Sequence, residues 1–342
     1  MSDTETQTIA KQSARPTVTI LAALNKALHD AFAEDAKLLA LGEDLADPEG
    51  GGILGVTAGL STTFGDDRVR STPISEQAII GAAIGASLVG YKPVAEIMLM
   101  NFTTVAMDMI VNHAAKLRFM SGGQTSVPIV IRTMTGSGFG SGGQHTDYLE
   151  AWFAHVAGIK VVAPSTPEDA YGLLRSAIED ADPVIFIENL PTYHNATSFE
   201  LPDSSHRVPL GKAAVQREGT DVTVISYARM ADESRVAAAK AAEQGISVEM
   251  IDLRTMAPWD RETVLASATK TGRVVIVHEA VKEHGLGAEI AAVISEELFG
   301  KLKKPVKRLG GAFSAVPYSR PLELAHAPDA ERILQAIVDI AK

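Results

Sequence analysis

The chain has 342 residues, enough for about two domains of ordinary size, and 46% of them are hydrophobic, enough to fill a core in each. It contains no cysteine, which excludes a disulfide framework, a zinc site with cysteine ligands and a thiol nucleophile, and which fits a reducing cytoplasm. The net charge of -11 argues against a nucleic-acid-binding or anionic-membrane-binding surface, because such surfaces depend on clustered Lys and Arg.

The N-terminal segment is polar and carries acids, without the apolar core of a signal peptide or the arginine-rich character of a transit peptide. Residues 1–16 are therefore expected to form a disordered tail. No uncharged run of about 18 apolar residues occurs in the sequence, so we expect no membrane-spanning segment and a cytoplasmic protein. The basic run KLKKPVKR at 301–308 is interpreted as a solvated face before an edge strand, with partner docking as the alternative.

From residue 17 the chain alternates helix and strand. Apolar residues at helical spacing from Ile20 to Phe32 predict a first helix, which the short run LLALGED follows. Further strands are predicted at 93–99, 127–134, 159–164 and 183–189. Further helices are predicted at 76–89, about 103–119 and 167–180. The strands are continuous β-branched runs, which are typical of a parallel sheet covered on both faces, so residues 17–190 predict an α/β domain.

Residues 191–218 lose this alternation and are rich in Pro, Ser and Asn, which predicts an inter-domain linker across the surface. A second α/β unit is predicted over 219–342. Its strands are predicted at 221–228, 247–254 and 273–280, and its helices at 234–245 and 287–300. Sequential strands and helices imply right-handed crossovers. The predicted fold class is therefore α/β, with two doubly wound, mainly parallel-sheet domains.

Two glycine and histidine patterns invite a functional interpretation. Loop 135–147, TGSGFGSGGQHTD, contains a G-x-G-x-x-G match, but a dinucleotide site opens into a helix and has an acid at the end of the next strand, which here ends in VVAP. A glycine loop that positions His145 over a pocket is favoured. HEAVKEH at 278–284 spaces its histidines by six residues instead of four, which disfavours a metalloprotease-type site.

The segment STPISEQAIIGAAIGASLVG at 71–90 places one carboxylate, Glu76, at the start of a helix made otherwise of small and apolar residues. One interpretation is an exposed carboxylate at the helix N-terminus, favoured by the helix dipole. The other is a helix start packed closely against another element, with a buried carboxyl group suited to proton exchange.

TPISE at 72–76 belongs to a series of ordered blocks that runs through nearly the whole chain after residue 16. The other blocks include GED at 42–44, NHAAKLRFMSGG at 112–123, QH at 144–145, GIKVVAPSTPEDAYGLL at 158–174, IDLRTMAPWD at 251–260 and KTGRVVIVHEA at 270–280. Together they resemble the β subunits of 2-oxo-acid dehydrogenase decarboxylases. The resemblance implies a transketolase-like pyrimidine-binding domain followed by a transketolase C-terminal domain.

The resemblance implies thiamine diphosphate as the cofactor and Glu76 as the residue that contacts N1′ of its aminopyrimidine, where a proton activates the thiazolium C2 carbon. Ile74 and Phe102 are implied beside the cofactor, and Glu43 in an acidic proton path from Glu76. His145 is implied at the thiazolium end, where it assists acyl transfer to a lipoyl group. The alternatives are a plain core aromatic for Phe102 and a solvated loop histidine for His145.

Members of the resembled family hold the diphosphate through Mg²⁺ with a GDG motif and a later Asn, whereas this chain has only GDD at 65–67. The resemblance therefore implies that an α subunit supplies most of the Mg²⁺ site, in an α2β2 heterotetramer, with a lipoyl acyltransferase core as a further partner. It also implies a structural K⁺ ion held by main-chain carbonyls, with Asp182 at a position that is usually Asn. These carbonyls belong to Ile129, Ala177, Ile178, Asp180 and Asp182.

The substrate stays open at this point. GGILGVTAGL at 51–60, IRTM at 131–134 and YARM at 227–230 look closer to acetoin dehydrogenase β subunits than to pyruvate ones. QHTD replaces the more usual QHSQ, which leaves both the substrate and the use of a lipoyl acceptor in question. The alternative is a non-catalytic docking subunit, and the presence of both Glu76 and His145 argues against it.

Overall fold

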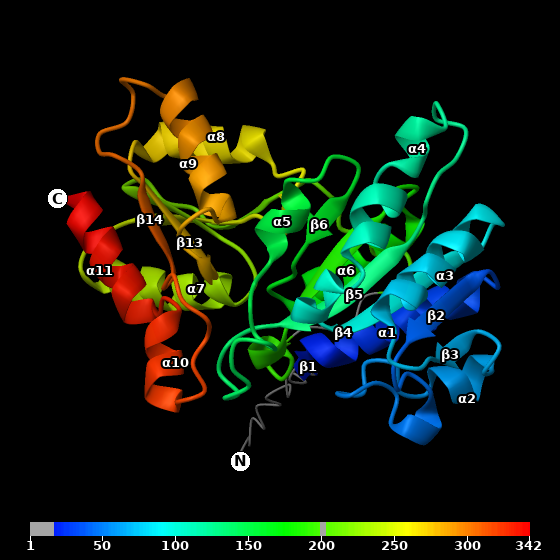
Figure 1. The fold of residues 1–342 in the computed structure, drawn as a ribbon. Coiled ribbons are helices and arrows are strands. Elements are labelled where there is room, and N and C mark those ends of the chain that lie inside the picture. The colour runs from blue at the N-terminus through cyan, green and yellow to red at the C-terminus, as the bar shows by residue number, and fades with distance from the viewer. Residues whose placement is uncertain (1–16, 199–202) are drawn as a thin grey trace, which may run out of the picture.

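The computed structural model describes residues 17–198 and 203–342, so the predicted tail 1–16 lies outside the described residues. Two α/β domains lie side by side, each built on a twisted sheet (Figure 1). The described residues contain no helix with the length and apolar character needed to cross a lipid bilayer.

The first sheet has seven strands. In spatial order they are β12 (Thr255–Ala257), β6 (Lys160–Val162), β7 (Val184–Asn189), β5 (Val130–Thr135), β4 (Lys92–Leu99), β2 (Leu38–Gly42) and β3 (Val69–Ser71). All neighbours pair in parallel except β12 and β6. β5 and β7 are buried at every residue, as expected for inner strands of a parallel sheet that helices cover on both faces.

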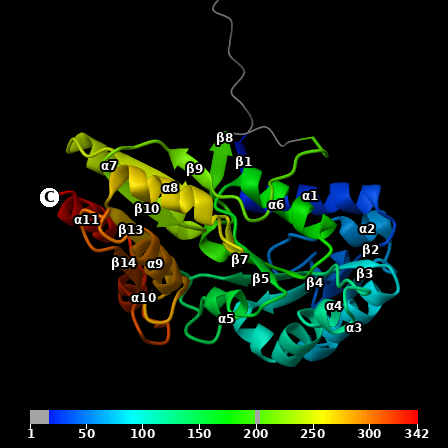
Figure 2. The ribbon, with the colours of Figure 1, turned by 90° about the horizontal axis from the view of Figure 1, so that it is seen from above.

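Helices cover both faces of this sheet (Figure 2). One face carries α1 (Ile20–Glu34) and α6 (Pro167–Glu179), and the other carries α3 (Glu76–Leu88), η3 (Met109–Ala114), α4 (Leu117–Met120) and α5 (Glu150–Ala154). Local signals set the helix starts: the hydroxyl groups of Thr19 and Thr166 accept from the backbone N–H groups of Ala22 and Asp169. Short elements η1 (Asp47–Glu49), α2 (Leu60–Phe64), η2 (Met100–Thr104) and η4 (Leu190–Thr192) lie in the connections.

The second sheet has five strands. Their order is β14 (Lys307–Gly311), β13 (Val274–Val281), β10 (Val222–Ser226), β11 (Val248–Asp252) and β9 (Ala214–Arg217), and only β9 is antiparallel to its neighbour. Helices α7 (Arg229–Glu243) and α11 (Ala330–Ala341) pack on one face, and α8 (Arg261–Thr271) and α9 (Leu286–Glu297) on the other. The basic run 301–308 leads into β14, which is an edge strand, as predicted.

The structure corrects one predicted helix. The segment 103–119 is not one helix but is divided among the end of η2, the π-helical η3 and α4. The hydroxyl groups of Thr103 and Thr104 bond back to the carbonyls of Met100 and Asn101, at 2.6 and 2.7 Å, and so compete with regular helix bonding.

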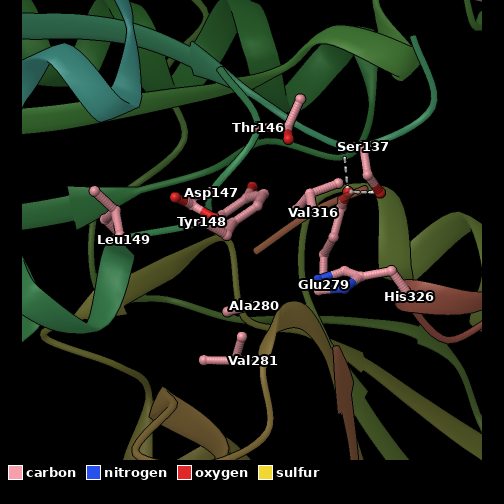
Figure 3. Close-up of a pocket in the computed structure, with 10 residues that line it drawn as sticks. All are labelled: Ser137, Thr146, Asp147, Tyr148, Leu149, Glu279, Ala280, Val281, Val316 and His326. Atoms are coloured by element: carbon pink, nitrogen blue, oxygen red, sulfur yellow. Dashed lines mark hydrogen bonds between the residues drawn. The ribbon is translucent and has the colours of Figure 1, made fainter. Parts of the chain in front are cut away.

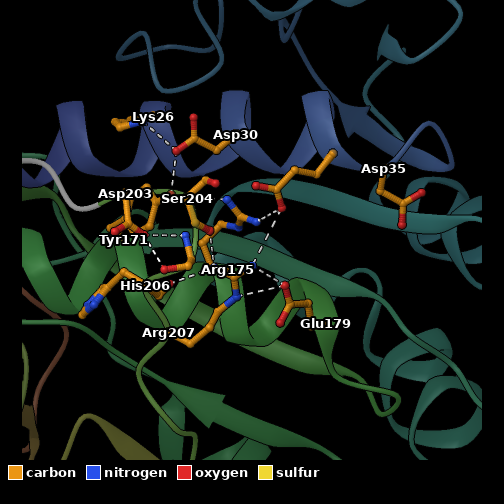
Figure 4. Close-up of polar contacts among 12 residues, drawn as sticks. Lys26, Asp30, Asp35, Tyr171, Arg175, Glu179, Asp203, Ser204, His206 and Arg207 are labelled. Atoms are coloured by element: carbon orange, nitrogen blue, oxygen red, sulfur yellow. Dashed lines mark hydrogen bonds and ion pairs between the residues drawn. The ribbon is translucent and has the colours of Figure 1, made fainter.

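The segment 191–218 runs from the first domain to the second and contains two strands. β8 (Ala196–Ser198) pairs antiparallel with β1 (Thr17–Thr19), and β9 joins the second sheet. Arg207 fixes this segment to the first domain through polar contacts (Figure 4). Arg207 Nε donates to Glu179 at 2.9 Å, while buried Arg175 pairs with Glu34 and Tyr171 OH donates to Asp30 at 2.6 Å. The segment is thereby held against α1 and α6.

Candidate functional site

Four of the predicted site residues follow the carboxyl ends of neighbouring parallel strands. Glu43 follows β2, Glu76 begins the helix after β3, Phe102 lies in η2 after β4, and His145 lies in the loop after β5. The order β3-β2-β4-β5 makes these strands adjacent in the sheet. Parallel strands end at one edge, so the fold gathers four of the residues named from the sequence at the place where open α/β sheets bind ligands.

Glu76 is buried, with 7% of its surface exposed, and it is the first residue of α3. The N-cap residue Ser75 makes no side-chain bond to the helix. Burial, the charge of Glu76 and the charge of Asp44 together raise the pKa of the Glu43 carboxyl. The negative charge of Glu76 therefore acts on the Glu43 carboxyl at this edge of the sheet. Ile74, in the turn before α3, is 82% exposed.

Phe102 and His145 are brought together. Their ring centroids lie 5.5 Å apart in an edge-on arrangement, and the imidazole Nδ1 of His145 is buried without a hydrogen-bond partner in the described chain. The amide of Asn101 donates to the Gly143 carbonyl at 3.2 Å and to the Asp147 carboxylate at 2.8 Å. These bonds tie the segment that carries Phe102 to the loop that carries His145.

The loop between β5 and α5 borders the second domain. A small cavity of about 70 Å³ lies at this boundary (Figure 3). Its polar lining residues include Ser137, Asp147 and Tyr148 of the first domain and Glu279 and His326 of the second. The glycine loop does not open directly into a helix, since α5 begins only at Glu150. It therefore lacks the strand-turn-helix geometry of a dinucleotide site.

A buried ionic cluster lies within the sheet, and the sequence interpretation missed it. Arg132 on β5 donates to Glu96 on β4 at 2.5 Å and to Glu188 on β7 at 2.6 and 2.8 Å. Burial raises the pKa of the Glu96 carboxyl, and the charge of Glu43 adds to the effect. The signal in the sequence was a charged residue in the middle or near the end of each of three mainly apolar strands: Glu96, Arg132 and Glu188.

The two histidines of HEAVKEH are not brought together as metal ligands. His278 is buried in β13, where its Nδ1 lies 2.9 Å from the carbonyl oxygen of Ala280, and burial lowers its pKa to about 4. His284 lies beyond the end of that strand, with a positive φ of 58°. Within residues 17–198 and 203–342, no three His, Asp or Glu side chains gather as a metal ion would require.

The residues named for K⁺ lie at the amino ends of the strands, opposite the carboxyl ends near which Glu76 lies. Ile129 precedes β5, Ala177 and Ile178 are in the last turn of α6, and Asp180 and Asp182 precede β7. The Lys160 ammonium group lies 2.6 Å from the Asp180 carboxylate, and Arg118 pairs with Asp182 at 2.6 Å. The side chains of both aspartates are therefore already engaged.

Comparison with known proteins gives a consistent result over both domains. Residues 16–194 match the transketolase pyrimidine-binding domain and residues 211–333 match the transketolase C-terminal domain. A solved structure described as a split-gene transketolase, an inactive β4 tetramer, superposes with a TM-score of 0.77 over 95% of this chain and 98% of its own, at 23% identity. This likeness concerns the fold.

Three curated relatives are similar over nearly their whole length. The pyruvate dehydrogenase E1 component subunit beta-1 of Arabidopsis thaliana is 44% identical, over 93% of this chain and 88% of its own length. The acetoin:2,6-dichlorophenolindophenol oxidoreductase subunit beta of Cupriavidus necator is 41% identical, over 93% of this chain and 96% of its own length. The 3-methyl-2-oxobutanoate dehydrogenase subunit beta of Mycobacterium tuberculosis is 41% identical, over 97% of this chain and 94% of its own length. The chain belongs to this transketolase-like family of dehydrogenase β subunits, as the sequence blocks predicted.

Proposed function

We propose that the chain is the β subunit of a thiamine-diphosphate-dependent enzyme that cleaves the carbon–carbon bond next to a carbonyl group and passes the acyl group to a lipoyl acceptor. One observation carries this proposal: adjacent strand ends bring Glu76, Glu43, Phe102 and His145 to one edge, with the Glu76 carboxyl group buried. The dehydrogenase β subunits among the relatives do not favour the alternative of a non-catalytic docking subunit.

The residues fit an aminopyrimidine ring. Because the charge of Glu76 helps to raise the pKa of the Glu43 carboxyl, the two carboxyl groups are proposed to exchange a proton with a ring nitrogen. Glu76 holds that proton at N1′, Glu43 shares it, and the exposed Ile74 and the half-buried Phe102 offer apolar contact to the ring. When bound, thiamine diphosphate supplies a carbon that adds to the carbonyl and accepts the electron pair of the cleaved bond.

His145 is proposed to act at the other end of the cofactor. Its unpartnered Nδ1 and its position beside Phe102 support this role, because a buried ring nitrogen without a partner is costly unless a ligand satisfies it. There it donates a proton to, or accepts one from, the acyl acceptor during transfer.

An α subunit is proposed to complete the site and to hold the Mg²⁺ and the diphosphate. The free face of α3 supports this, because after Gln77 its exposed positions are small or apolar: Ala78, Ala82, Gly85 and Leu88, followed by the exposed C-cap residue Val89. Nearby, Phe119 is 88% exposed and Met120 is 74% exposed. An apolar patch of this kind marks an interaction surface, and small residues on α3 permit close approach of a partner helix.

A K⁺ ion on the main-chain carbonyls of Ile129, Ala177, Ile178, Asp180 and Asp182 remains part of the proposal. The Ile129 carbonyl accepts from Val184 N–H at 3.0 Å and keeps a second lone pair for a cation.

Pyruvate, branched-chain 2-oxo acids and acetoin remain the candidate substrates, because relatives with identities of 41–44% include all three classes of dehydrogenase. The lipoyl acyltransferase partner and the cytoplasmic location remain predictions.

The test of the proposed function is Glu76→Gln in the enzyme assembled with its α subunit. The amide keeps the shape but cannot exchange the proton, so C2-proton exchange of bound thiamine diphosphate and turnover should both fall by about 10²–10⁴-fold. Glu168→Gln is the matched control, since Glu168 is also an acid in the first turn of a helix but is exposed. Exchange at the wild-type rate in Glu76→Gln would show that Glu76 is only a helix-terminal charge.

The partner face is tested by Gly85→Leu. A Cβ at Gly85 meets no atom within 4 Å, so the isolated chain should fold unchanged, while a bulky side chain should prevent assembly with the α subunit. Ala239→Leu, at an exposed position of α7, is the control. Analytical ultracentrifugation distinguishes the outcomes: an intact heteromer with Gly85→Leu contradicts the proposed interface.

The chain alone should bind thiamine diphosphate weakly in calorimetry, with or without Mg²⁺.

A further inference from the structure

Two buried carboxylates of the second domain hold the glycine loop of the first domain. Glu279 on β13 accepts from the backbone N–H and the hydroxyl of Ser137, at 2.7 and 2.8 Å. Glu323, in α10 (Arg320–His326), accepts from the N–H groups of Gly138, at 2.6 Å, and Gly140, at 3.1 Å. The first of these two contacts is visible at the cavity wall in Figure 3. Three backbone N–H groups of one loop thus point at carboxylates of the other domain.

The loop has the geometry of an anion-binding nest. Gly136, Gly138, Gly140 and Gly142 all have positive φ, between 68° and 130°, which turns successive N–H groups toward one side. Glu323 is only 2% exposed. A carboxylate buried to this degree is stable only when hydrogen bonds replace its lost hydration. The glycines that resemble a dinucleotide motif therefore bind a carboxylate of the chain itself.

The same loop continues to His145 through a short series of contacts. His145 N–H donates to the Gly142 carbonyl at 3.2 Å. Tyr318 of the second domain covers Gly142 so closely that a Cβ there would overlap its ring, and Ala315 lies 2.9 Å from the place of a Cβ on Gly143. Displacing the loop from Glu323 thus displaces the residues that set the backbone of His145.

We propose that Glu323 is a positioning residue for His145, because its carboxylate fills the nest formed by Gly138 and Gly140 and fixes the loop at the domain boundary. Glu279 fixes Ser137, near the start of the same loop. Arg229 supports this contact, since it donates to the Ser137 carbonyl at 2.9 Å and lies 3.5 Å from Glu279. This inference rests on the role of His145 in the proposed function. The second domain thereby controls acyl transfer without touching the substrate.

The test uses Glu323→Ala in the assembled enzyme, with the exposed Glu296→Ala as the matched control. Hydrogen–deuterium exchange of residues 136–143 should become faster in Glu323→Ala alone. Acyl transfer to a lipoyl acceptor should fall on the order of 10²-fold, because a misplaced group loses its productive geometry. C2-proton exchange, which depends on Glu76, should stay at the wild-type rate. A defect in folding would lower both rates instead.

Added formate supplies a separate readout, because a small carboxylate can fill the empty nest of Glu323→Ala and should restore part of the acyl-transfer rate, while it leaves Glu296→Ala unchanged. If Glu323→Ala does not assemble, Glu323→Gln is measured instead. The neutral amide oxygen of Glu323→Gln accepts weaker hydrogen bonds than a carboxylate. Hydrogen–deuterium exchange of the loop should therefore become faster and acyl transfer slower, but both changes should be smaller than those expected for Glu323→Ala.

The possible failures are distinguishable. Unchanged loop exchange in Glu323→Ala and in Glu323→Gln overturns the proposed clamp. Faster loop exchange with unchanged acyl transfer overturns the positioning role, provided that His145→Ala itself slows transfer. If His145→Ala leaves transfer unchanged, the role of His145 in the proposed function is wrong, and the loop exchange still decides whether Glu323 holds the nest.

Discussion

Two pairs of glutamates in the first domain differ in what surrounds them. Glu96 and Glu188 lie within strands β4 and β7, and both bond to the guanidinium group of Arg132 between them. Glu43 and Glu76 lie beyond the ends of β2 and β3, where the negative charge of Glu76 helps to raise the pKa of the Glu43 carboxyl. The first pair is compensated within the sheet, and the second is not.

The difference separates carboxylates with a structural partner from those proposed to act on a ligand. A buried carboxylate is tolerated where hydrogen bonds and an opposite charge satisfy it, as Arg132 and the hydroxyl of Tyr193 do for Glu188. A carboxylate that lies beside a like charge at a ligand-binding edge lacks a compensating charge or proton, which a bound ligand can supply. Motif resemblance selects Glu76, and its burial at the strand ends beside Glu43 supports the proposed role.

The largest effect is expected from removing the cation of the compensated pair. Arg132→Ala leaves buried Glu96 without its partner and buried Glu188 with only the hydroxyl of Tyr193, so the free energy of unfolding should fall by about 3–5 kcal/mol in urea denaturation. Arg118→Ala is the control, because Arg118 forms an exposed pair with Asp182 and should change stability by less than about 1 kcal/mol. Equal losses in the two variants would contradict the distinction between buried and exposed pairs.

Glu150 is an intermediate case, because its partner is neutral. It is fully buried, Tyr227 OH donates to its Oε1 at 2.7 Å, and its Oε2 has no partner in the described chain. Burial raises its pKa from 4.5 to about 7. Between about pH 4.5 and pH 7 the folded state therefore keeps a proton that the unfolded state releases, and stability should fall as the pH rises through this window.

The expected contribution of Glu150 to this pH dependence is about 3 kcal/mol, at about 1.4 kcal/mol per pKa unit. Glu150→Gln carries no titrating group and keeps an acceptor for Tyr227, so its stability should decline less between about pH 5 and pH 8. Urea denaturation of both proteins at the two pH values measures the change in the free energy of unfolding with pH. Subtracting the change in Glu150→Gln from that in the wild type cancels the effect of other buried acids. Parallel pH profiles would show that Glu150 is already ionised.

Local signals account for the elements that the sequence predicted well. The helix predicted at 167–180 is observed as α6 from Pro167 to Glu179, because Thr166 and Pro167 define its start without help from the rest of the fold. β12 could not be predicted in this way. Its three residues follow a strand of the second domain and pair with β6 of the first, so its formation depends on how the two domains meet.

The site divides along the same line. The resemblance named Glu76 and His145 as candidate site residues, and the parallel sheet accounts for their common edge. The ion pair of Glu96 and Arg132 required the strand register, which aligns these two residues across β4 and β5. Glu323 is 185 residues from Gly138, and its flanking sequence gives no sign of the contact. Long-range contacts of this kind are absent from local sequence patterns.

The smallest effect is expected within the uncompensated pair, and it tests whether the two carboxyl groups are coupled. Because the charge of Glu76 contributes to the raised pKa of Glu43, Glu76→Gln should lower the pKa of Glu43 toward its ordinary value, while burial and Asp44 keep part of the shift. Carbon-13 NMR of labelled glutamate carboxyl groups, with Glu43→Gln used for assignment, measures the titration. Glu49→Gln is the control, since Glu49 is exposed and bonds to Ser71. A Glu43 titration that is the same in the wild type and in Glu76→Gln would mean that burial alone perturbs Glu43, and the proton path from Glu76 through Glu43 would then lose its physical basis.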